Sequence, residues 1–233
     1  MKKILLATCL LTLALTSNAH SREYPQNPVL RPLTLSAGTV ELTGIYVYGK
    51  QHDKDVDVAF GGDLSYGLTD SLELGLDGIT YSIFKNQHAG FELAAKAGIT
   101  GYFDDDLGDS LGLGSSLMAK QIINDNLAFT FSAGYTHWSI GNIDNKSEFD
   151  YTIGTLFNIA PDVTLAANYT FRDLKDFKQS TANEASIILN YAYSPSIDLG
   201  IGYQYSNFNE QYSNQALQET PEKTLGVYVN YRF

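Results

Sequence analysis

The carboxyl-terminal stretch 225–233 constrains this chain more than any other segment. Its apolar side chains occupy alternate positions, as in a β-strand with one apolar face and one polar face. The apolar set is Leu225, Val227, Val229, Tyr231 and Phe233. At the edge of a soluble sheet, so apolar a terminal strand invites edge-to-edge aggregation. Closing the sheet into a barrel surrounded by lipid removes the edge, so this ending predicts a transmembrane β-barrel.

The amino terminus has the pattern of a secretory signal peptide. Lys2 and Lys3 give it a positive head, Ile4 to Leu15 form an apolar core, and small residues precede a cleavage site after Ala19. The apolar core is too short for a membrane-spanning helix, which needs about 20 residues. We therefore predict that 1–19 is a cleaved signal peptide, and the one cysteine of the chain lies within it. A mature chain without thiols suits export through an oxidising periplasm.

Composition excludes several classes of protein. Hydrophobic residues make up 44% of the chain, yet no apolar run after Leu15 is long enough for a helical span. The 16 tyrosines and 12 phenylalanines, against one tryptophan, match the aromatic girdles of outer-membrane barrels. A net charge of −11 argues against nucleic-acid binding, which needs basic surface. No cofactor or metal is predicted, since the acidic stretch 104–109 lacks the ligand spacing of a calcium loop.

Short and long polar connections alternate along the chain. Short turns lie within 66–74, 123–129, 158–165 and 193–199, and longer polar segments lie at 50–55, 141–147, 173–184 and 209–223. Short periplasmic turns and long outer loops are the asymmetry expected of an outer-membrane barrel. We predict one all-β domain, a single closed up-and-down antiparallel transmembrane barrel over 39–233. The proline-containing segment 20–38 is predicted to be an extended periplasmic extension.

The strand count is ambiguous at one place. Apolar alternation marks strands at 39–49, 55–68, 71–84, 90–103, 110–122, 127–140, 148–159, 163–172, 184–194, 197–208 and 224–233. This is an odd number, whereas single-chain bacterial barrels have even numbers. Within 71–84 the apolar positions change parity at Asp77-Gly78, a turn or bulge signal. A hidden strand there gives about 12 strands, our prediction, and the alternative of a folded-in segment gives about 10.

Three segments together resemble small porin-like outer-membrane proteins of Gram-negative bacteria: 31–42, 66–74 and the closing Tyr231-Arg232-Phe233. The resemblance covers the mature chain and implies fold and location, with no defined substrate. It implies insertion by the barrel-assembly machinery, with Tyr231 and Phe233 as the assembly signal, among outer-membrane lipid and lipopolysaccharide. A soluble β-sandwich or lipocalin-like barrel is the alternative, but its inner face would be apolar. Here the second face of each strand is mostly Gly, Ser, Thr, Asn and charge.

Strand parity assigns a set of charged side chains to the lumen. They are Glu41, Asp57, Asp63, Glu73, Asp77, Glu92, Lys96, Lys120, Asp150, Arg172, Asp198 and Arg232. One interpretation is a network of opposite charges that fills the barrel. The other is a water-filled path whose acidic excess favours cations. The lumen of so small a barrel is narrow, so only small solutes can pass. We therefore predict a porin-like channel for small polar solutes with a mild cation preference.

Two other functions remain open. His137-Trp138-Ser139 is similar to the His-x-Ser motif of outer-membrane lipid A deacylases, in which Ser139 would be the nucleophile, His137 the base and Glu148 the orienting acid. That family has Asn directly after the serine, whereas this chain has Ile140, so we predict that the protein is not an enzyme. The third possibility is a structural or adhesive barrel that acts through outer loops such as 209–223.

Overall fold

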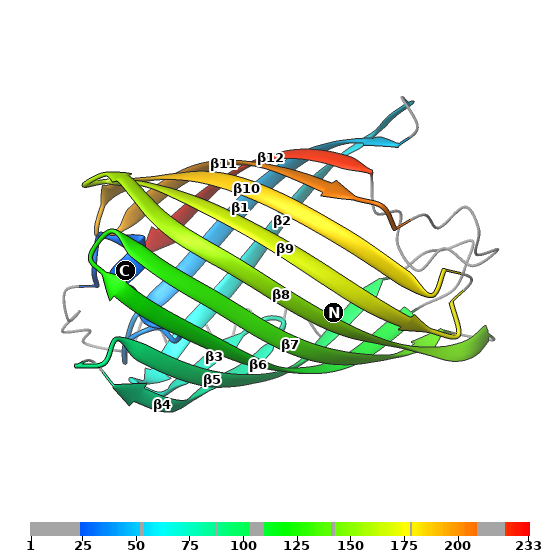
Figure 1. Cartoon of the computed structure of the whole chain (residues 1–233), viewed down its shortest axis with the longest axis horizontal. Coiled ribbons are helices and arrows are strands. Elements are labelled where there is room, and N and C mark those ends of the chain that lie inside the picture. The colour runs from blue at the N-terminus through cyan, green and yellow to red at the C-terminus, as the bar shows by residue number, and fades with distance from the viewer. Residues whose placement is uncertain are drawn as a thin grey trace.

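The protein is a closed antiparallel β-barrel of 12 strands (Figure 1). The computed structural model describes residues 24–51, 54–86, 88–102, 110–140, 143–177, 179–208 and 222–233. Each strand pairs with its neighbours in the sequence, and the first pairs with the last. The predicted fold class is therefore confirmed, and the alternative of ten strands is wrong.

The strands are β1 (Val40–Gln51), β2 (Lys54–Thr69), β3 (Leu72–Gly75), β4 (Gly78–Asn86), β5 (Phe91–Tyr102), β6 (Ser110–Asn124), β7 (Leu127–Ile140), β8 (Ile143–Ala160), β9 (Val163–Lys175), β10 (Thr181–Ser194), β11 (Ile197–Ser206) and β12 (Lys223–Arg232). The ring closes at the very end of the chain. The backbone N–H of Val40 donates to the Phe233 carbonyl at 2.9 Å, and the Phe233 N–H donates back to Val40 at 3.1 Å.

The hidden strand lies where the apolar parity changes. The segment 71–84 folds as the two strands β3 and β4, which are joined by a turn at Leu76-Asp77. Gly78 has a φ of 151°, and a Cβ there would lie 2.3 Å from the Ala97 carbonyl oxygen of β5. A residue with a side chain would therefore be strained at this position. The Asp77-Gly78 pair therefore marks the turn of a short hairpin that forms part of the barrel wall.

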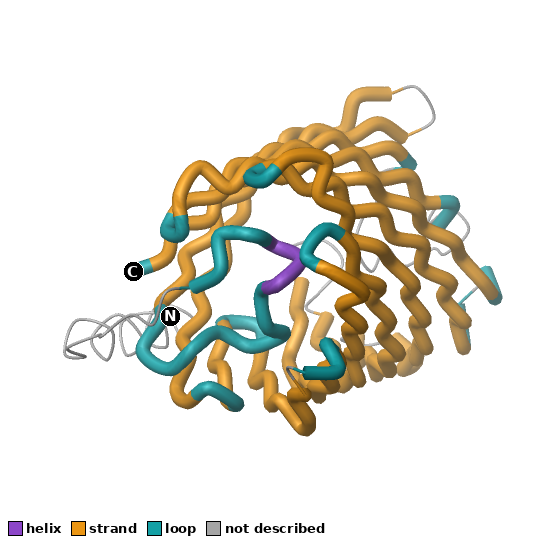
Figure 2. The backbone as a smooth tube through the Cα atoms, turned by 60° about the vertical axis from the view of Figure 1, so that its left-hand side comes forward, coloured by secondary structure: helices purple, strands orange, loops and turns teal. Residues whose placement is uncertain are grey.

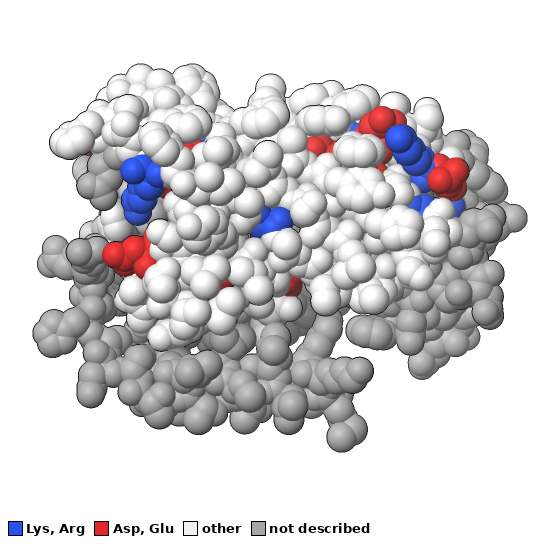
Figure 3. Space-filling model, turned by 90° about the horizontal axis from the view of Figure 1, so that it is seen from below, with Lys and Arg blue, Asp and Glu red and all other residues white. Residues whose placement is uncertain are grey.

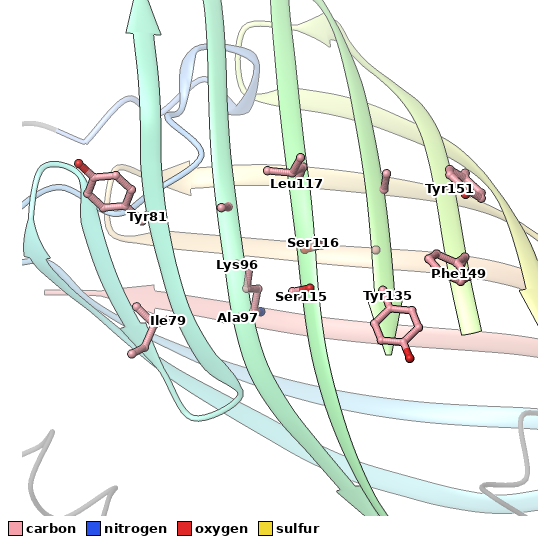
Figure 4. A pocket seen from close by; sticks show the side chains of 13 residues that line it. Ile79, Tyr81, Lys96, Ala97, Ser115, Ser116, Leu117, Tyr135, Phe149 and Tyr151 are labelled. Atoms are coloured by element: carbon pink, nitrogen blue, oxygen red, sulfur yellow. The ribbon is translucent and has the colours of Figure 1, made fainter. Parts of the chain in front are cut away.

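This hairpin leaves the wall uneven, because β3 is only four residues long. β3 pairs with Ser65–Thr69 of β2, and β4 pairs with β5 only as far as Gly98. β2 and β5 both continue past the β3–β4 turn, and there the described residues include no strand between them. At the level of the turn these two strands are three inter-strand spacings apart, about 14 Å. Figure 4 shows β5 and β6, the strands that carry Lys96 and Ser116, running on past the hairpin.

The outer face of the barrel is apolar along its middle. The residues Leu225, Val227, Val229, Tyr231 and Phe233 are each 44–47% exposed, and equivalent positions on the other strands carry exposed Ile, Leu, Phe and Tyr. In Figure 3 the charged side chains gather toward the two ends of the face shown, with a broad, almost uncharged band between them. A soluble barrel would bury its apolar face instead. Among the described residues, no helix has the length and apolar character needed to cross a membrane.

The buried apolar residues are few, and one cluster of them lies at the end of the barrel with the short turns. Val40, Leu64 and Tyr66 form one cluster on β1 and β2, packed against Leu74. The segment that precedes β1 contributes Val29 and Leu35, which are 0% and 4% exposed. The segment includes a short 3-10 helix, η1 (Pro28–Leu30), whose Val29 N–H donates to the Asn27 side chain at 2.9 Å. Buried apolar residues of the amino-terminal segment therefore accompany those of the wall.

Candidate channel lumen

Residues 24–38, which we call the plug, cross the inside of one mouth of the barrel (Figure 2). The Gln26 side chain donates to the Ala192 carbonyl on β10 at 2.8 Å, and the Asn27 side chain donates to the Asp125 carbonyl in the β6–β7 turn at 2.7 Å. On the far side, a Cβ at Gly67 of β2 would lie 2.1 Å from the Ser36 carbonyl oxygen, so only glycine admits the plug so closely. The segment that the sequence predicts to be a periplasmic lead-in thus contacts several sides of the ring.

Arg31 anchors the plug through a charge cluster. Its guanidinium binds both oxygens of Asp198, at 2.6 and 2.8 Å, and Asp198 is completely buried. Arg232 of β12 binds the same carboxylate at 2.5 Å and also binds Glu41 of β1 at 2.5 Å. The Tyr24 ring lies 5.5 Å from the Arg31 guanidinium and 4.9 Å from that of Arg232. Two carboxylates and two guanidiniums thus neutralise one another, and the bidentate pair fixes the position of Arg31.

Three more predicted lumen residues hold the backbone of the plug. Glu92 accepts a hydrogen bond from the Leu33 N–H at 2.9 Å, and Glu73 accepts one from the Leu35 N–H at 2.8 Å. The Lys120 ammonium donates to the Arg31 carbonyl at 2.6 Å. Buried charges of this kind need hydrogen-bond partners, and here the plug supplies them. At this mouth the charged network joins the plug to the wall.

A second charge cluster lies near the opposite end. Arg172 of β9 binds Glu148 of β8 at 2.5 Å and Glu184 of β10 at 2.9 Å, and its guanidinium lies 4.8 Å from the centre of the Phe208 ring. Phe208 packs with Leu174, Ala182 and Phe177 in a small apolar cluster. Lys146 donates to the Asp176 carbonyl at 2.9 Å. The outer end is therefore also narrowed, with more carboxylate than guanidinium in the cluster.

Between the two clusters the inner wall is small and polar. A cavity of about 260 Å³, which we call the mid-lumen cavity, lies against β5–β8 and the β3–β4 turn. Its lining is Asp77, Lys96, Gly98, Ile99, Thr100, Gly114, Ser115, Ser116, Gly134, Thr136 and Asp150. Lys96 of β5 binds Asp77 of the β3–β4 turn at 2.5 Å. Because the lining consists mainly of glycine, serine and threonine, side chains leave this part of the lumen open.

The other face of the same wall carries an apolar groove of about 680 Å³ (Figure 4). Ile79, Tyr81, Leu117, Tyr135 and Tyr151 contribute its larger side chains, and Ala95, Ala97 and Ala133 its smaller ones. All of these residues belong to the outward parity. The groove therefore lies mainly on the lipid-facing surface, and its lining also includes Lys96, Ser116 and Gly134, which line the mid-lumen cavity.

For the remaining predicted lumen residues, Asp63 and Asp57, the structure gives fewer contacts. Asp63 is half-buried on β2, opposite Thr43 of β1. The side chain of Asp57 lies outside the described residues, as does the acidic stretch 104–109. Sequence reasoning missed Arg31 and Glu184. Glu184 shares the even parity of Asp198 and was recognisable on that basis, whereas the segment around Arg31 has no strand periodicity.

The three residues of the enzyme hypothesis lie on opposite faces of the wall. His137 Nδ1 lies 3.2 Å from the Ser147 hydroxyl, and Ser139 is exposed on the same outward face. Glu148 points into the lumen, where Arg172 binds it. Among the described side chains, His137, Ser139 and Glu148 form no hydrogen-bonded relay. Loop 209–223, on which the adhesive hypothesis rests, falls almost wholly outside the described residues.

Two solved structures of outer-membrane proteins are similar to this chain. The NanC porin matches with a TM-score of 0.54 at 15% identity, over 82% of this chain and 98% of the other. An outer membrane channel from Pseudomonas putida F1 matches with a TM-score of 0.60 at 13% identity, over 86% and 97%. No protein-family model and no curated protein matches the chain. At these identities the likeness shows the fold, and this chain has the closed-barrel fold of porin-like outer-membrane proteins.

Proposed function

We propose that this protein is a narrow outer-membrane channel for small polar solutes, with a mild preference for cations. The observation that carries the proposal is the mid-lumen cavity, an open space lined mainly by glycine, serine and threonine inside a barrel whose outer face is apolar. A barrel that served only as a scaffold would fill this layer with interlocking side chains. Glycine and serine on three adjacent strands leave it unfilled.

The cation preference follows from the balance of charge in the lumen. At the outer end, Glu148 and Glu184 share Arg172, and Asp150 lies beside Arg172 in the strand register. In a narrow pore with low-dielectric walls, an excess of carboxylate raises the local concentration of cations and repels anions. At the plug, four carboxylates (Glu41, Glu73, Glu92 and Asp198) face three cations (Arg31, Lys120 and Arg232), so that mouth has a smaller relative excess of carboxylate.

The plug restricts the flow of solutes through the barrel, and the extent of the restriction depends on how firmly the plug is docked. It crosses the mouth at the short-turn end, which is the periplasmic end of a barrel with this topology. We infer that solutes pass either around the plug or when it loosens. The single-channel conductance should accordingly be low.

The same proposal includes a route to the membrane. The segment 1–19 is removed on export, and the last strand with Tyr231 and Phe233 directs insertion by the barrel-assembly machinery among outer-membrane lipid and lipopolysaccharide. Tyr231 and Phe233 lie on the lipid face with ring centres 5.5 Å apart, accessible along the final strand.

Recording from the mature protein in planar lipid bilayers tests the channel proposal. We expect small current steps, and under a salt gradient a reversal potential with the sign of a cation-preferring pore. A bilayer that stays silent at high protein load contradicts the channel function. An anion-selective reversal potential contradicts only the cation preference.

A further inference from the structure

We propose that the mid-lumen cavity is a binding site for small hydroxylated amines, with the carboxylate of Asp150 as the group that receives the ammonium. This inference deepens the proposed channel function by naming the class of solute. It rests on three observations: the charge around Asp150, the way that the wall holds its carboxylate, and the hydroxyl groups that face the same cavity.

The negative charge of Asp150 is not balanced by a partner. Asp150 of β8 lies opposite Arg172 of β9 in the register, but both terminal nitrogens of Arg172 bind Glu148 and Glu184. Among the described residues, Asp150 makes no ion pair within 4.0 Å. Three carboxylates therefore share one guanidinium, and the electrostatic potential in the lumen beside them favours a cation.

The wall holds the Asp150 carboxylate in the cavity. Gly134 of β7 is its neighbour across the strands, and a Cβ on Gly134 would lie 2.4 Å from the Asp150 Oδ1. The carboxylate thus occupies the space that a side chain at position 134 would take. On the next pair of strands, Thr136 lies over Gly114 in the same way, with its hydroxyl 3.1 Å from the position of a Cβ. Both polar groups rest against the wall and leave the cavity in front of them open.

The rest of the cavity suits hydroxyl groups. Thr100, Ser116 and Thr136 supply three side-chain hydroxyls, each both donor and acceptor. The Lys96–Asp77 pair on the neighbouring strand and turn supplies one further donor and acceptor. A volume of about 260 Å³ lies below the roughly 300–1,000 Å³ typical of pockets for drug-sized ligands. The site therefore fits a solute of monosaccharide size or smaller.

An organic ammonium fits the site better than a metal ion. A bound Ca²⁺ takes six to eight oxygen ligands, usually with several carboxylates. Among the described residues, no group of three or more potential metal ligands converges. One unbalanced carboxylate surrounded by hydroxyls instead matches one protonated amine on a hydroxylated body.

Current block by matched sugars tests the proposal. Glucosamine, at a pH where its amine is protonated, carries an ammonium where glucose has a hydroxyl, and N-acetylglucosamine has the same carbon frame without charge. We expect glucosamine to interrupt the single-channel current at a concentration at least tenfold lower than either neutral sugar. In Asp150→Asn this advantage should be lost while the current steps persist.

Two variants provide the controls. Asp125→Asn removes the same charge from an exposed turn, and glucosamine should block its current at the same concentration as in the wild type. Gly134→Ala pushes the Asp150 carboxylate from its place and should weaken the block while retaining the charge. Folding of each variant is checked by the heat-dependent shift in gel mobility.

Equal block by charged and neutral sugars, or unchanged block in Asp150→Asn, overturns the inference and leaves the channel function standing. If the bilayer is silent, the channel proposal fails, and saturation-transfer NMR of the same sugars with the detergent-solubilised protein decides the binding site by itself. Binding of glucosamine that Asp150→Asn abolishes supports the site, and its absence in the wild type refutes it.

Discussion

At the scale of single residues, Arg31 links the plug to the wall and also shapes the plug itself. Besides Asp198, its guanidinium donates to the Pro25 carbonyl at 2.9 Å and to the Gln26 carbonyl at 2.7 Å. One side chain therefore fixes both the fold of the segment and its attachment. No other described residue of the plug makes a bidentate contact with a buried carboxylate.

We predict that Arg31→Ala loosens the plug and raises the channel conductance. The substitution leaves buried Asp198 with Arg232 alone, which costs on the order of 3 kcal/mol of docking free energy. Arg31→Lys keeps the charge but cannot form the paired contact, so its conductance should be intermediate. Single-channel recording measures both. Conductance in Arg31→Ala equal to the wild type would show that the plug does not limit the current.

We predict that the channel conductance depends on pH because of Tyr24, which lies in the plug. Burial and the nearby Glu41 carboxylate raise the pKa of the Tyr24 phenol from 10.0 to about 12. Docking therefore favours the neutral phenol, and the stabilisation is complete below about pH 10 and disappears as the pH rises through about 12. Tyr24→Phe keeps the ring beside Arg31 and Arg232 but cannot ionise. The conductance of the wild type should rise above that of Tyr24→Phe over this range, and parallel titrations of the two would contradict the prediction.

At the scale of secondary-structure elements, the β3–β4 hairpin depends on one backbone position. We predict that Gly78→Ala destabilises the barrel by about 1–3 kcal/mol, because its φ of 151° and the Ala97 carbonyl leave no room for a Cβ. Gly44→Ala on β1 is the matched control, since a Cβ there meets nothing within 4 Å. Urea unfolding in lipid vesicles compares the two. Equal midpoints would mean that the hairpin does not contribute to the stability of the wall.

The sequence predicts these elements well where alternation is regular, and less well elsewhere. β12 and β11 begin within a residue of the predicted starts, because each is bounded by polar turn residues. β8 begins at Ile143, five residues before the predicted start at 148, since its pairing with β7 continues to Ile143 beyond the apolar stretch. The 3-10 helix η1 was not predicted, because a turn of three residues in a proline-rich segment has no periodic signal.

At the scale of the whole molecule, the short β3 makes the ladder of hydrogen bonds uneven. We predict that in residues 54–63 of β2 the amides that point toward β1 are protected from hydrogen exchange, whereas those that point toward the hairpin side exchange quickly. β7 is paired on both sides over its length and serves as the internal control. Exchange measured by mass spectrometry or NMR in detergent tests this. Uniform protection along both strands would show that the wall is continuous there.

The overall architecture followed from the sequence because lipid outside and water inside impose a period of two on every strand. Strand parity alone assigned Asp198 and Arg232 to the lumen, without any knowledge of the residues that bind them. The pairing of those charges did not follow, since Arg31 reaches them from a segment without strand periodicity. The sequence predicted a water-filled path but not the position of the mid-lumen cavity, because that position depends on which glycines of β5, β6 and β7 become neighbours in the register.

The plug is joined without a break to β1, since only Thr39 lies between the plug and Val40, the first residue of that strand. Its binding site therefore sees it at a high effective concentration, on the order of millimolar or above for a short tether. Dilution cannot remove it, and a free peptide of the same sequence must compete against that local concentration. Occupancy of the mouth is thus an intramolecular equilibrium that is the same at every level of expression.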